Sequence, residues 1–342
     1  MTAIPPLVRS LLDALREPAL LLDGERLAAA NAAARAVLGQ AIEGRDVRFA
    51  IRHPDALELL LGSAREGELD FIGIGGAERP WRLSLRPLGD RNMRLALLTD
   101  RTEALAADRL RVDFVANASH ELRTPLATII GYGETLAEDA PLDEPLRRRF
   151  GATLLGEARR MLRLIEELMS LSRIEAERFR APGSAIDLAD IARTAVADSA
   201  LLAERRGIAL SLEVEPGVAP VAGDPVLLGR VVTNLIDNAI RHGCNDSSCA
   251  VRVTLGADPA GVRLAVRDDG DGIAAEHLPR LTQRFYRVDP ARSRDGGGTG
   301  LGLAIVKHIV ERHRGRLDIS SSVGEGTEVA ITLPISRSLS SI

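Results

Sequence analysis

Apolar residues recur at different periods along the chain, and the changes of period divide it into three stretches. Across residues 1–100, short apolar runs alternate with turn residues, which predicts the strands and small helices of an α+β sheet. Across residues 101–180, the apolar spacing is helical, at intervals of three and four residues. From residue 186 to residue 334, helical and strand patterns alternate, which predicts a separate α/β sandwich.

The first stretch opens with a short amphipathic helix that carries Leu7, Leu11, Leu12 and Leu15. A strand, a turn at Asp23-Gly24 and a second strand follow. Asn31 is expected to start an Ala-rich helix that ends near Gly39. A helix over 57–61 and three strands around 69–74, 81–87 and 93–99 complete the predicted sheet.

The second stretch predicts two long helices. Residues 101–112 suit a helical connector, and the first helix is expected to run to about Asp139, with a break over 140–143. The second helix carries the heptad seam of a bundle, made of Leu154, Ala158, Met161, Ile165, Leu168 and Ser172. Two antiparallel helices cannot enclose such a seam alone, so we expect a dimeric four-helix bundle.

After a linker over 179–185, the last stretch predicts helices over 188–205, 225–242 and 303–314, and strands over 208–214, 250–256, 262–268, 316–321 and 328–333.

Composition narrows the class of protein. The 342 residues are 27% charged and 45% apolar, a soluble globular balance, and the net charge of −4 argues against direct binding of nucleic acid. No run approaches the ~20 apolar residues needed to span a bilayer, and the N-terminus lacks a signal-peptide pattern, so we expect a cytoplasmic chain.

The two cysteines, Cys244 and Cys249, lie in a polar turn. Because no histidine stands nearby at ligand spacing, the pair is weak evidence for a zinc site. We expect ordinary cytosolic thiols, with a labile disulfide as the alternative.

Residues 114–126 place His120 and Glu121 beside the apolar face of a predicted helix. An exposed imidazole is a competent nucleophile near neutral pH, and an adjacent carboxylate can accept its proton. Pro125 lacks an amide hydrogen, so it is expected to loosen the helix just after the histidine. A merely solvated helix face is the alternative interpretation.

Two polar clusters in the last stretch suit a nucleotide. Asn234, Asn238 and Arg241 are spaced by four and three residues, so they share a helical face that offers amide oxygens to Mg²⁺ and a guanidinium to phosphate. A polar surface is the alternative. The acidic, glycine-containing loop over 268–273 follows a strand, and its first carboxylate can accept a hydrogen bond from a base. The loop lacks the EF-hand pattern of a calcium site.

Two glycine-rich turns complete this set. Residues 296–303 run into an apolar helix, where backbone N–H groups can cradle phosphate, although neither a Walker A nor a GxGxxG motif is present. Residues 322–327 form a tight turn between strands, which a structural hairpin explains equally well.

Taken together, these motifs resemble those of bacterial sensor histidine kinases over roughly residues 109–334. Ser-His-Glu-Leu-Arg-Thr-Pro-Leu at 119–126 is similar to the family's H-box, and the four later clusters resemble its N, G1, G2 and G3 boxes in order. Residues 284–289 resemble the F-box before a mobile ATP lid. The order of domains is most similar to that of the phosphate-responsive PhoR-type kinases.

The resemblance implies four segments: a PAS-like sensor domain over 1–100, the connector over 101–112, a dimerisation and histidine-phosphotransfer domain over 113–180, and a GHKL-type ATP-binding domain over 186–336. Nothing in the first segment names a ligand, and we do not expect its single histidine, His53, to bind haem. Many relatives are membrane-anchored, so a membrane-associated partner or an anchor missing from this sequence is the alternative to a soluble member.

The same resemblance implies residue roles. Asn234 and Asn238 would hold Mg²⁺, and Asp268 would accept from the adenine amino group. The positions that would contact ATP are Asn234, Asn238, Arg241, His242, Asp268, Gly270, Gly272, Ile273, Phe285, Arg287, Gly298, Thr299, Gly300, Leu301, Gly302, Leu303 and Thr327. Three positions depart from the usual residues, namely Arg241, Gly243 and Asp269.

The implied activity is that of an ATP-dependent protein-histidine kinase that works as a homodimer. His120 would attack the γ-phosphate, Glu121 would polarise the imidazole, and Arg287 or Arg292 would steady the phosphate. The phosphoryl group would pass to an aspartate of a cognate response regulator, which Thr124 would help to dephosphorylate. The alternatives are another class of GHKL ATPase and a catalytically silent nucleotide-binding scaffold.

Overall fold

The computed structural model describes residues 4–74, 78–89, 93–138, 143–177, 182–244, 249–288 and 298–336. The chain divides into two compact units, Met1–Asp113 and Phe114–Ile342. Outside the described residues lie three expected features: residues 140–142 of the break over 140–143, residues 179–181 of the linker over 179–185, and Arg292. No helix within the described ranges combines the length and apolarity needed to cross a membrane.

The first unit is built on a five-stranded antiparallel sheet in the order β2-β1-β5-β4-β3. Its elements are α1 (Pro6–Ala14), β1 (Ala19–Asp23), β2 (Arg26–Ala30), α2 (Ala32–Leu38), η1 (Val47–Phe49), α3 (Pro54–Leu61), β3 (Gly67–Ile72), β4 (Pro80–Pro87) and β5 (Met93–Asp100). The α+β sheet predicted from the sequence is confirmed.

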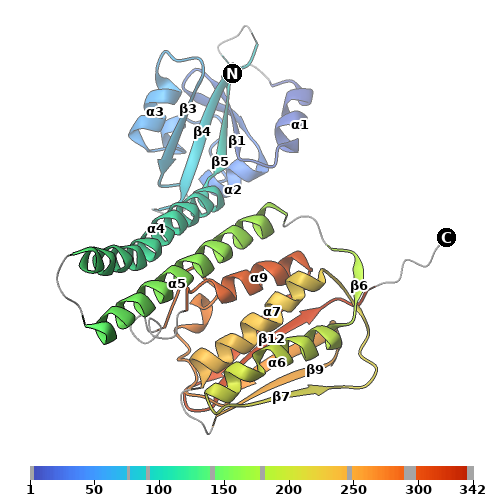
Figure 1. Ribbon diagram of the computed structural model, residues 1–342. Coiled ribbons are helices and arrows are strands. Elements are labelled where there is room, and N and C mark those ends of the chain that lie inside the picture. Colours follow the sequence, from blue (N-terminus) through green and yellow to red (C-terminus); the bar gives the residue numbers. More distant parts are fainter. Residues whose placement is uncertain are drawn as a thin grey trace. The chain divides into compact units, whose positions relative to one another are not determined.

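Alternation along β1 explains why helices cover both faces of this sheet. Leu20 and Leu22 belong to the core beneath α2 and α3, whereas Leu21 packs with Leu12 of α1 on the other face (Figure 1). Asn31 fixes the start of α2, because its Oδ1 accepts from the amide of Ala34 at 2.8 Å.

A single helix, α4 (Thr102–Ala137), contains both the expected connector and the histidine segment. Asp100 caps its start by accepting from the amide of Thr102 at 2.9 Å, and the hydrogen bonds of Thr102 are the main reason that the pKa of Asp100 falls to about 2. The helix continues through Pro125, so the expected loosening does not interrupt it. Pro125 is itself buried.

A second long helix, α5 (Glu144–Ala176), pairs with α4 as an antiparallel hairpin (Figure 1). Asp143 caps α5 by accepting from the amide of Leu146 at 2.9 Å. The rings of Tyr132 and Phe150 meet across the hairpin at 4.8 Å between centroids.

The apolar positions of α5 form three rows instead of the single predicted seam. Within the predicted set Leu154, Met161 and Leu168 are half-buried, while Ala158, Ile165 and Ser172 are exposed. A second row, Leu164, Leu171 and Ile174, is buried in the core that α5 shares with the α/β sandwich over residues 184–333. A third row that includes Leu155, Leu162 and Met169 is exposed.

The remainder of the second unit is an α/β sandwich whose sheet has the order β11-β12-β10-β9-β7. Its elements are β6 (Ser184–Ile186), α6 (Leu188–Arg205), β7 (Ala209–Val214), β8 (Val221–Gly223), α7 (Pro225–Asn238), η2 (Ala239–Gly243), β9 (Ala250–Asp258), β10 (Gly261–Asp268), η3 (Leu278–Arg280), α9 (Gly302–Arg312), β11 (Arg316–Ser322) and β12 (Gly326–Leu333). The helices α6, α7 and α9 lie on one face of the sheet (Figure 1).

Two features of this domain differ from the sequence predictions. The strands β6 and β8 form a separate two-stranded sheet that was not expected, because three residues are too short to show a period. The helix predicted over 225–242 keeps α-helical geometry only to Asn238, and Ala239–Gly243 forms a π-helical turn.

Candidate active site

Asp268 ends the central strand β10, where it is only 5% exposed. Its Oδ1 accepts from the amides of Gly270 at 3.1 Å and Thr327 at 3.3 Å, which leaves Oδ2 available to a further donor. Burial raises the pKa of Asp268, although these two amides oppose the shift. The carboxylate is therefore positioned by the backbone of two segments that are distant in sequence.

The glycines around Asp268 are required by close backbone packing. A Cβ on Gly243 would lie 2.3 Å from Cγ of Asp268, and one on Gly270 would lie 1.9 Å from the carbonyl oxygen of Gly243. Gly272 has φ +68°, and its Cβ would lie 1.9 Å from the carbonyl oxygen of Ser322. This explains the unusual Gly243, because the space that a side chain would need is filled by the carboxylate.

The loop after Asp268 is joined to the turn before β12. The amide of Ile273 donates to Oγ of Ser321 at 2.8 Å, and that hydroxyl is 2.8 Å from Oγ1 of Thr327. The second and fourth predicted clusters therefore lie together at one end of the sheet.

Asn234 and Asn238 lie on α7, and Arg241 lies in the π-helical turn after it. Their spacing predicted one shared α-helical face. Because the geometry changes to a π-helical turn at Ala239, the three residues do not lie on one regular α-helical face. Arg241 forms an ion pair with Asp237 at 3.6 Å.

The glycine-rich loop lies beside this helix. A Cβ on Gly302, the first residue of α9, would lie 3.7 Å from the side-chain amide of Asn238. A Cβ on Gly298 would lie 2.9 Å from Nε2 of His242. Burial lowers the pKa of His242, and Arg287 and Arg241 lower it further, so the imidazole is held neutral.

Phe285 anchors the same loop. Its backbone has φ +62°, an unfavourable value for a side chain of this size, and its amide donates to the carbonyl of Gly300 at 2.9 Å. Gly300 has φ +73°, and a Cβ there would lie 2.9 Å from Cα of Phe285. Leu301 is fully buried, and Leu303 packs against the same core.

These residues fit a magnesium-bound nucleotide. Within the part of the chain that the structure describes, the buried Nδ2 of Asn234 has no hydrogen-bond partner, which is a costly arrangement unless a ligand meets it. Amide oxygens are suitable ligands for Mg²⁺, and the start of α9 offers backbone N–H groups to phosphate.

His120 lies on α4 with its side chain exposed. Glu121, expected to act on the imidazole, instead forms an ion pair with Arg160 of α5 at 3.5 Å. Neighbours in a helix do not face each other, which explains why the two side chains diverge. One turn after His120, Thr124 is exposed and donates to the His120 carbonyl at 3.4 Å.

Several contacts between α5 and the α/β sandwich were not anticipated from the sequence. Oγ1 of Thr299 is hydrogen-bonded to Glu167, whose pKa is raised by burial although this bond lowers it. Arg284 pairs with Glu175 and lies over the ring of Phe114 at 5.0 Å. No sequence signal could identify Glu167 or Glu175, because both look like ordinary surface residues of a charged helix.

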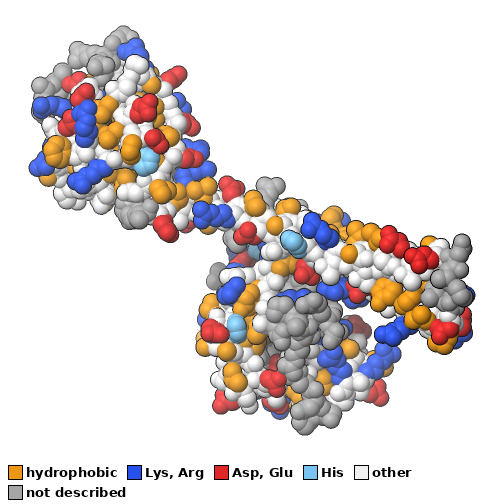
Figure 2. Space-filling view, turned by 90° about the vertical axis from the view of Figure 1, so that its left-hand side faces the viewer, with side chains coloured by type: hydrophobic (Ala, Val, Ile, Leu, Met, Phe, Trp, Pro, Cys, Tyr) orange, Lys and Arg blue, Asp and Glu red, His pale blue; other side chains and the backbone are white. Residues whose placement is uncertain are grey.

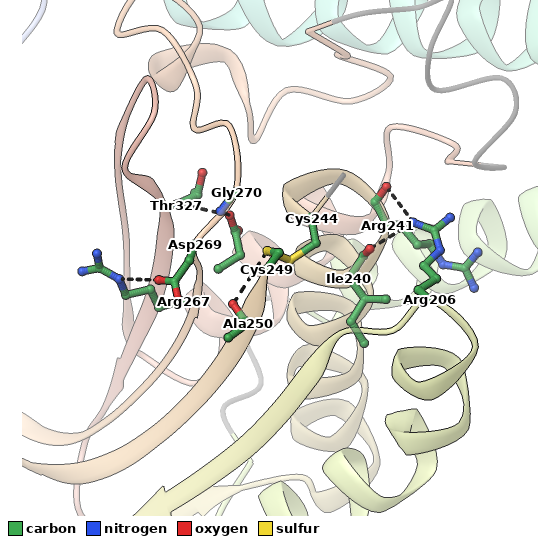
Figure 3. The surroundings of a disulfide bond; sticks show 11 residues. Arg206, Ile240, Arg241, Cys244, Cys249, Ala250, Arg267, Asp269, Gly270 and Thr327 are labelled. Atoms are coloured by element: carbon green, nitrogen blue, oxygen red, sulfur yellow. Dashed lines mark hydrogen bonds and ion pairs between the residues drawn. A yellow bond between two sulfur atoms is a disulfide. The ribbon is translucent and has the colours of Figure 1, made fainter. Parts of the chain in front are cut away.

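The expectation of free thiols is wrong, because Cys244 and Cys249 form a disulfide (Figure 3). Their Cα atoms are 5.5 Å apart, a separation that allows the bond. The two residues adjoin the π-helical turn and β9, and folding brings those two segments together beside Asp268.

Two sequence families match the chain. The family described as "His Kinase A (phospho-acceptor) domain" matches residues 110–177, and the one described as "Histidine kinase-, DNA gyrase B-, and HSP90-like ATPase" matches residues 223–337.

Known proteins are similar over a larger part of the chain. The phosphate regulon sensor protein PhoR of Pseudomonas aeruginosa is 35% identical over 318 residues, which cover 92% of this chain and 71% of PhoR. The sensor-like histidine kinase SenX3 of Mycolicibacterium smegmatis is 35% identical over 72% of this chain and 63% of its own length. The solved structure of histidine kinase ThkA in complex with response regulator protein TrrA matches with a TM-score of 0.51 at 18% identity. It covers 95% of this chain and 98% of that one, a likeness of fold alone.

Proposed function

The chain belongs to the sensor histidine kinases of two-component systems, and on that basis we propose that ATP bound beside Asp268 and Asn238 phosphorylates His120. The observation that carries the proposal is the gathering of four sequence clusters, far apart in the chain, around one buried carboxylate and one helix N-terminus. The exposed imidazole of His120 belongs to the same compact unit.

The chain's own groups suggest how the nucleotide is held. Oδ2 of Asp268 would accept from the adenine amino group, and the loop from Gly298 to Gly302 would surround the phosphates. Asn234 and Asn238 would hold Mg²⁺, which supplies charge neutralisation for phosphoryl transfer when it is bound. Thr327, Ile273 and the buried leucine Leu301 would keep these groups in place.

His120 would act as the nucleophile through its exposed imidazole. Because Glu121 is paired with Arg160, we propose that its main role is to orient α4 against α5, and that polarisation of the imidazole requires a change in this ion pair. Positioning and electrostatic stabilisation together supply most of the rate acceleration in phosphoryl transfer.

Labelling tests the kinase proposal. Wild type and His120→Gln are incubated with γ-labelled ATP and Mg²⁺, and acid-labile, alkali-stable label on the protein is measured while nucleotide binding is followed in parallel. We expect label on wild type alone, with equal ATP binding by both proteins. Equal label on both proteins would refute the assignment of His120.

The partner is proposed to be the receiver domain of a separate response regulator, whose aspartate takes the phosphoryl group. ATP and such receivers are cytoplasmic, so we propose that this chain acts there. Thr124, exposed one turn after His120, suits a hydroxyl that orients water for dephosphorylation of the receiver. Thr124→Ala should abolish dephosphorylation and Thr124→Ser should retain it; unchanged rates in both variants would overturn this role.

We propose that the protein is a homodimer and that residues 4–100 form a PAS-like sensor. The homodimer is supported by apolar side chains at the surface of the hairpin (Figure 2). On α5 the exposed ones include Leu155, Leu162 and Met169. A second hairpin would bury them as a four-helix bundle. The PAS-like assignment is supported by the five-stranded sheet and its order.

A further inference from the structure

The Cys244–Cys249 disulfide has no part in the kinase reaction proposed above, yet it adjoins the nucleotide site. Cys244 directly follows the π-helical turn Ala239–Gly243, and Cys249 directly precedes β9. The bond thus joins the end of the helix that carries Asn234 and Asn238 to a strand of the central sheet (Figure 3).

On the helical side, the bond reaches the site through Gly243. The backbone at Gly243 is so close to Asp268 that a Cβ would overlap the carboxylate at 2.3 Å. The amide of Cys244 donates to the carbonyl of Ala239 at 3.0 Å, which closes the π-helical turn. A displacement of Cys244 would therefore move the backbone that packs against Asp268.

On the strand side, the bond reaches the site through Ala250. The carbonyl of Ala250 accepts from the amide of Asp269 at 3.2 Å, and the next residue, Val251, is the β9 partner of Asp268. Two of the segments that pack against Asp268, the π-helical turn and β9, are therefore joined by the same covalent bond.

A second restraint keeps the turn folded when the bond is absent. Arg206 donates to the carbonyls of Ile240 at 3.0 Å and Arg241 at 3.3 Å from the other side of the turn (Figure 3). The disulfide closes only a short loop, with a sequence separation of 5, so it constrains the unfolded chain less than a long-range disulfide would. Reduction should loosen the site without unfolding the domain.

We propose that Cys244 and Cys249 are a reversible thiol–disulfide modification site, and that the oxidised pair holds the ATP site in its high-affinity form. The inference rests on the proposed binding of ATP beside Asp268. Disulfides of proteins that work in the reducing cytosol are mostly transient and often sense redox conditions. A site that is already ordered binds more tightly, because less ordering is needed on binding.

The reductant is a dithiol, either a small molecule or a protein. One of its thiolates attacks a sulfur of the pair and releases the other cysteine as a thiolate, which takes up a proton. The second thiol of the reductant then attacks the reductant's own sulfur in the mixed disulfide and releases the remaining cysteine as a thiolate, which takes up the second proton. Two electrons and two protons pass to the cysteines, and the dithiol becomes a disulfide.

Linkage gives the inference a test that a merely structural bond would not pass. If oxidation tightens ATP binding by a factor, ATP must favour the disulfide over the two thiols by the same factor. Both sulfurs belong to residues that are at most 5% exposed, so exchange also requires local opening of the turn. Bound nucleotide should therefore slow reduction.

The experiment uses the full chain and dithiothreitol as the dithiol. The Kd of Mg²⁺ with a non-hydrolysable ATP analogue is measured for the oxidised protein and for protein shown by thiol titration to carry two free thiols. The equilibrium between disulfide and thiols is then measured in mixtures of reduced and oxidised dithiothreitol, with and without the analogue. Controls are Cys244→Ser, Cys249→Ser and the double variant.

We expect reduction to raise the Kd by at least about fivefold, and the analogue to shift the redox equilibrium by the same factor. The serine variants should bind as the reduced protein does and ignore dithiothreitol. Equal Kd values in both states, or a redox equilibrium that the analogue leaves unchanged, would overturn the inference. So would a disulfide that excess dithiothreitol cannot reduce. Failure of the analogue to bind in either state would instead refute the proposed ATP site.

Discussion

Asp268 stands where three segments of the ATPase-like domain meet. The π-helical turn contributes Gly243, the loop after β10 contributes the amide of Gly270, and β12 contributes the amide of Thr327. Both amides donate to Oδ1, so the carboxylate has a fixed orientation before any ligand arrives. A group that is held in this way needs little reorganisation on binding.

Replacement of Asp268 by Asn should weaken ATP binding by about 10- to 100-fold, because an amide cannot satisfy donors on both sides and a buried donor is left unpaired at a cost of about 1–3 kcal/mol. Isothermal titration with an ATP analogue measures the loss. Asp269→Asn is the matched control, since it removes the same charge one residue away and should leave binding equal or slightly tighter. Equal losses in the two variants would contradict this role of Asp268.

The pH dependence of binding follows from the same carboxylate. Only ionised Asp268 accepts at Oδ2 as proposed, and burial raises its pKa. As the pH falls through this raised pKa, affinity for ATP should decline at a higher pH than an ordinary aspartate would give. The decline should be absent from Asp268→Asn, and its persistence there would show that another group is titrating.

Sequence patterns identified Asp268 as a candidate site residue but could not identify Glu167. The acidic loop beginning at Asp268 stood out because glycines surround it and a strand precedes it. Glu167 is buried and hydrogen-bonded only because folding brings Thr299, 132 residues away in the sequence, next to it. No local pattern encodes such a contact.

Glu167→Gln should stabilise the protein at neutral pH, because Gln can still accept from Thr299 without a charge that burial disfavours. Since the folded-state pKa of Glu167 is raised, its ionised form costs stability above that pKa, and the cost disappears as the pH falls below the pKa of the unfolded chain. The extra stability of Glu167→Gln should therefore shrink as the pH falls. Thermal unfolding of both proteins at several pH values measures this.

Two further variants make this interpretation specific. Glu167→Ala should lose about 1 kcal/mol with the hydrogen bond. The exposed neighbour Glu166, changed to Gln, should leave stability nearly unaltered. A gain of Glu167→Gln that is the same at every pH would contradict the account.

At the scale of elements, periodicity predicted most helices and strands but not the places where regular geometry ends. The strand β10 and the helix α6 end within a residue of their predicted bounds, because turn residues and caps mark them. The π-helical turn Ala239–Gly243 was missed, since its residues continue an apolar pattern that an α-helix would also show. Its position follows from packing of Gly243 against Asp268.

The turn after β10 requires glycine at position 272, whereas the exposed Gly156 of α5 can be replaced. Gly272→Ala should cost at least about 1–2 kcal/mol, because φ +68° disfavours a side chain and Cβ would collide with the carbonyl of Ser322. Gly156→Ala on the solvent side of α5 meets nothing within 4 Å and should be neutral or stabilising by about 0.5–1 kcal/mol. Chemical unfolding of both variants decides this, and equal stabilities would contradict the claim.

At the scale of the whole molecule, α5 carries a row of apolar side chains that stays exposed among the described residues of one chain. Leu162 is 56% exposed and Met169 is 53% exposed, although the spacing of the row is that of a helical seam. The sequence predicts that a second hairpin covers α5, which stays a proposal. The exposed row lies one residue beyond Leu154, Met161 and Leu168 of the predicted seam. Alternating rows on a helix that packs on several sides cannot be assigned to partners by spacing alone.

A charge in this row should prevent dimerisation. Leu162→Arg should shift the chain from dimer to monomer in sedimentation equilibrium at micromolar concentration, because an unpaired charge in a packed seam costs several kcal/mol. Gly156→Arg adds the same charge at an exposed position that does not face the row, because adjacent residues of a helix point in different directions, and it should leave the dimer intact. Equal dimer dissociation constants for the two variants would contradict the proposed interface.

The most direct test of the account is to locate the transferred phosphoryl group. Wild-type protein is incubated with Mg²⁺ and ATP, digested at alkaline pH and mapped by tandem mass spectrometry. We expect phosphorylation at His120, because its imidazole is exposed whereas the neighbouring hydroxyls of Ser119 and Thr124 donate to the carbonyls of Val115 and His120. A phosphoryl group on Ser119, on Thr124 or on any residue other than His120 would contradict it.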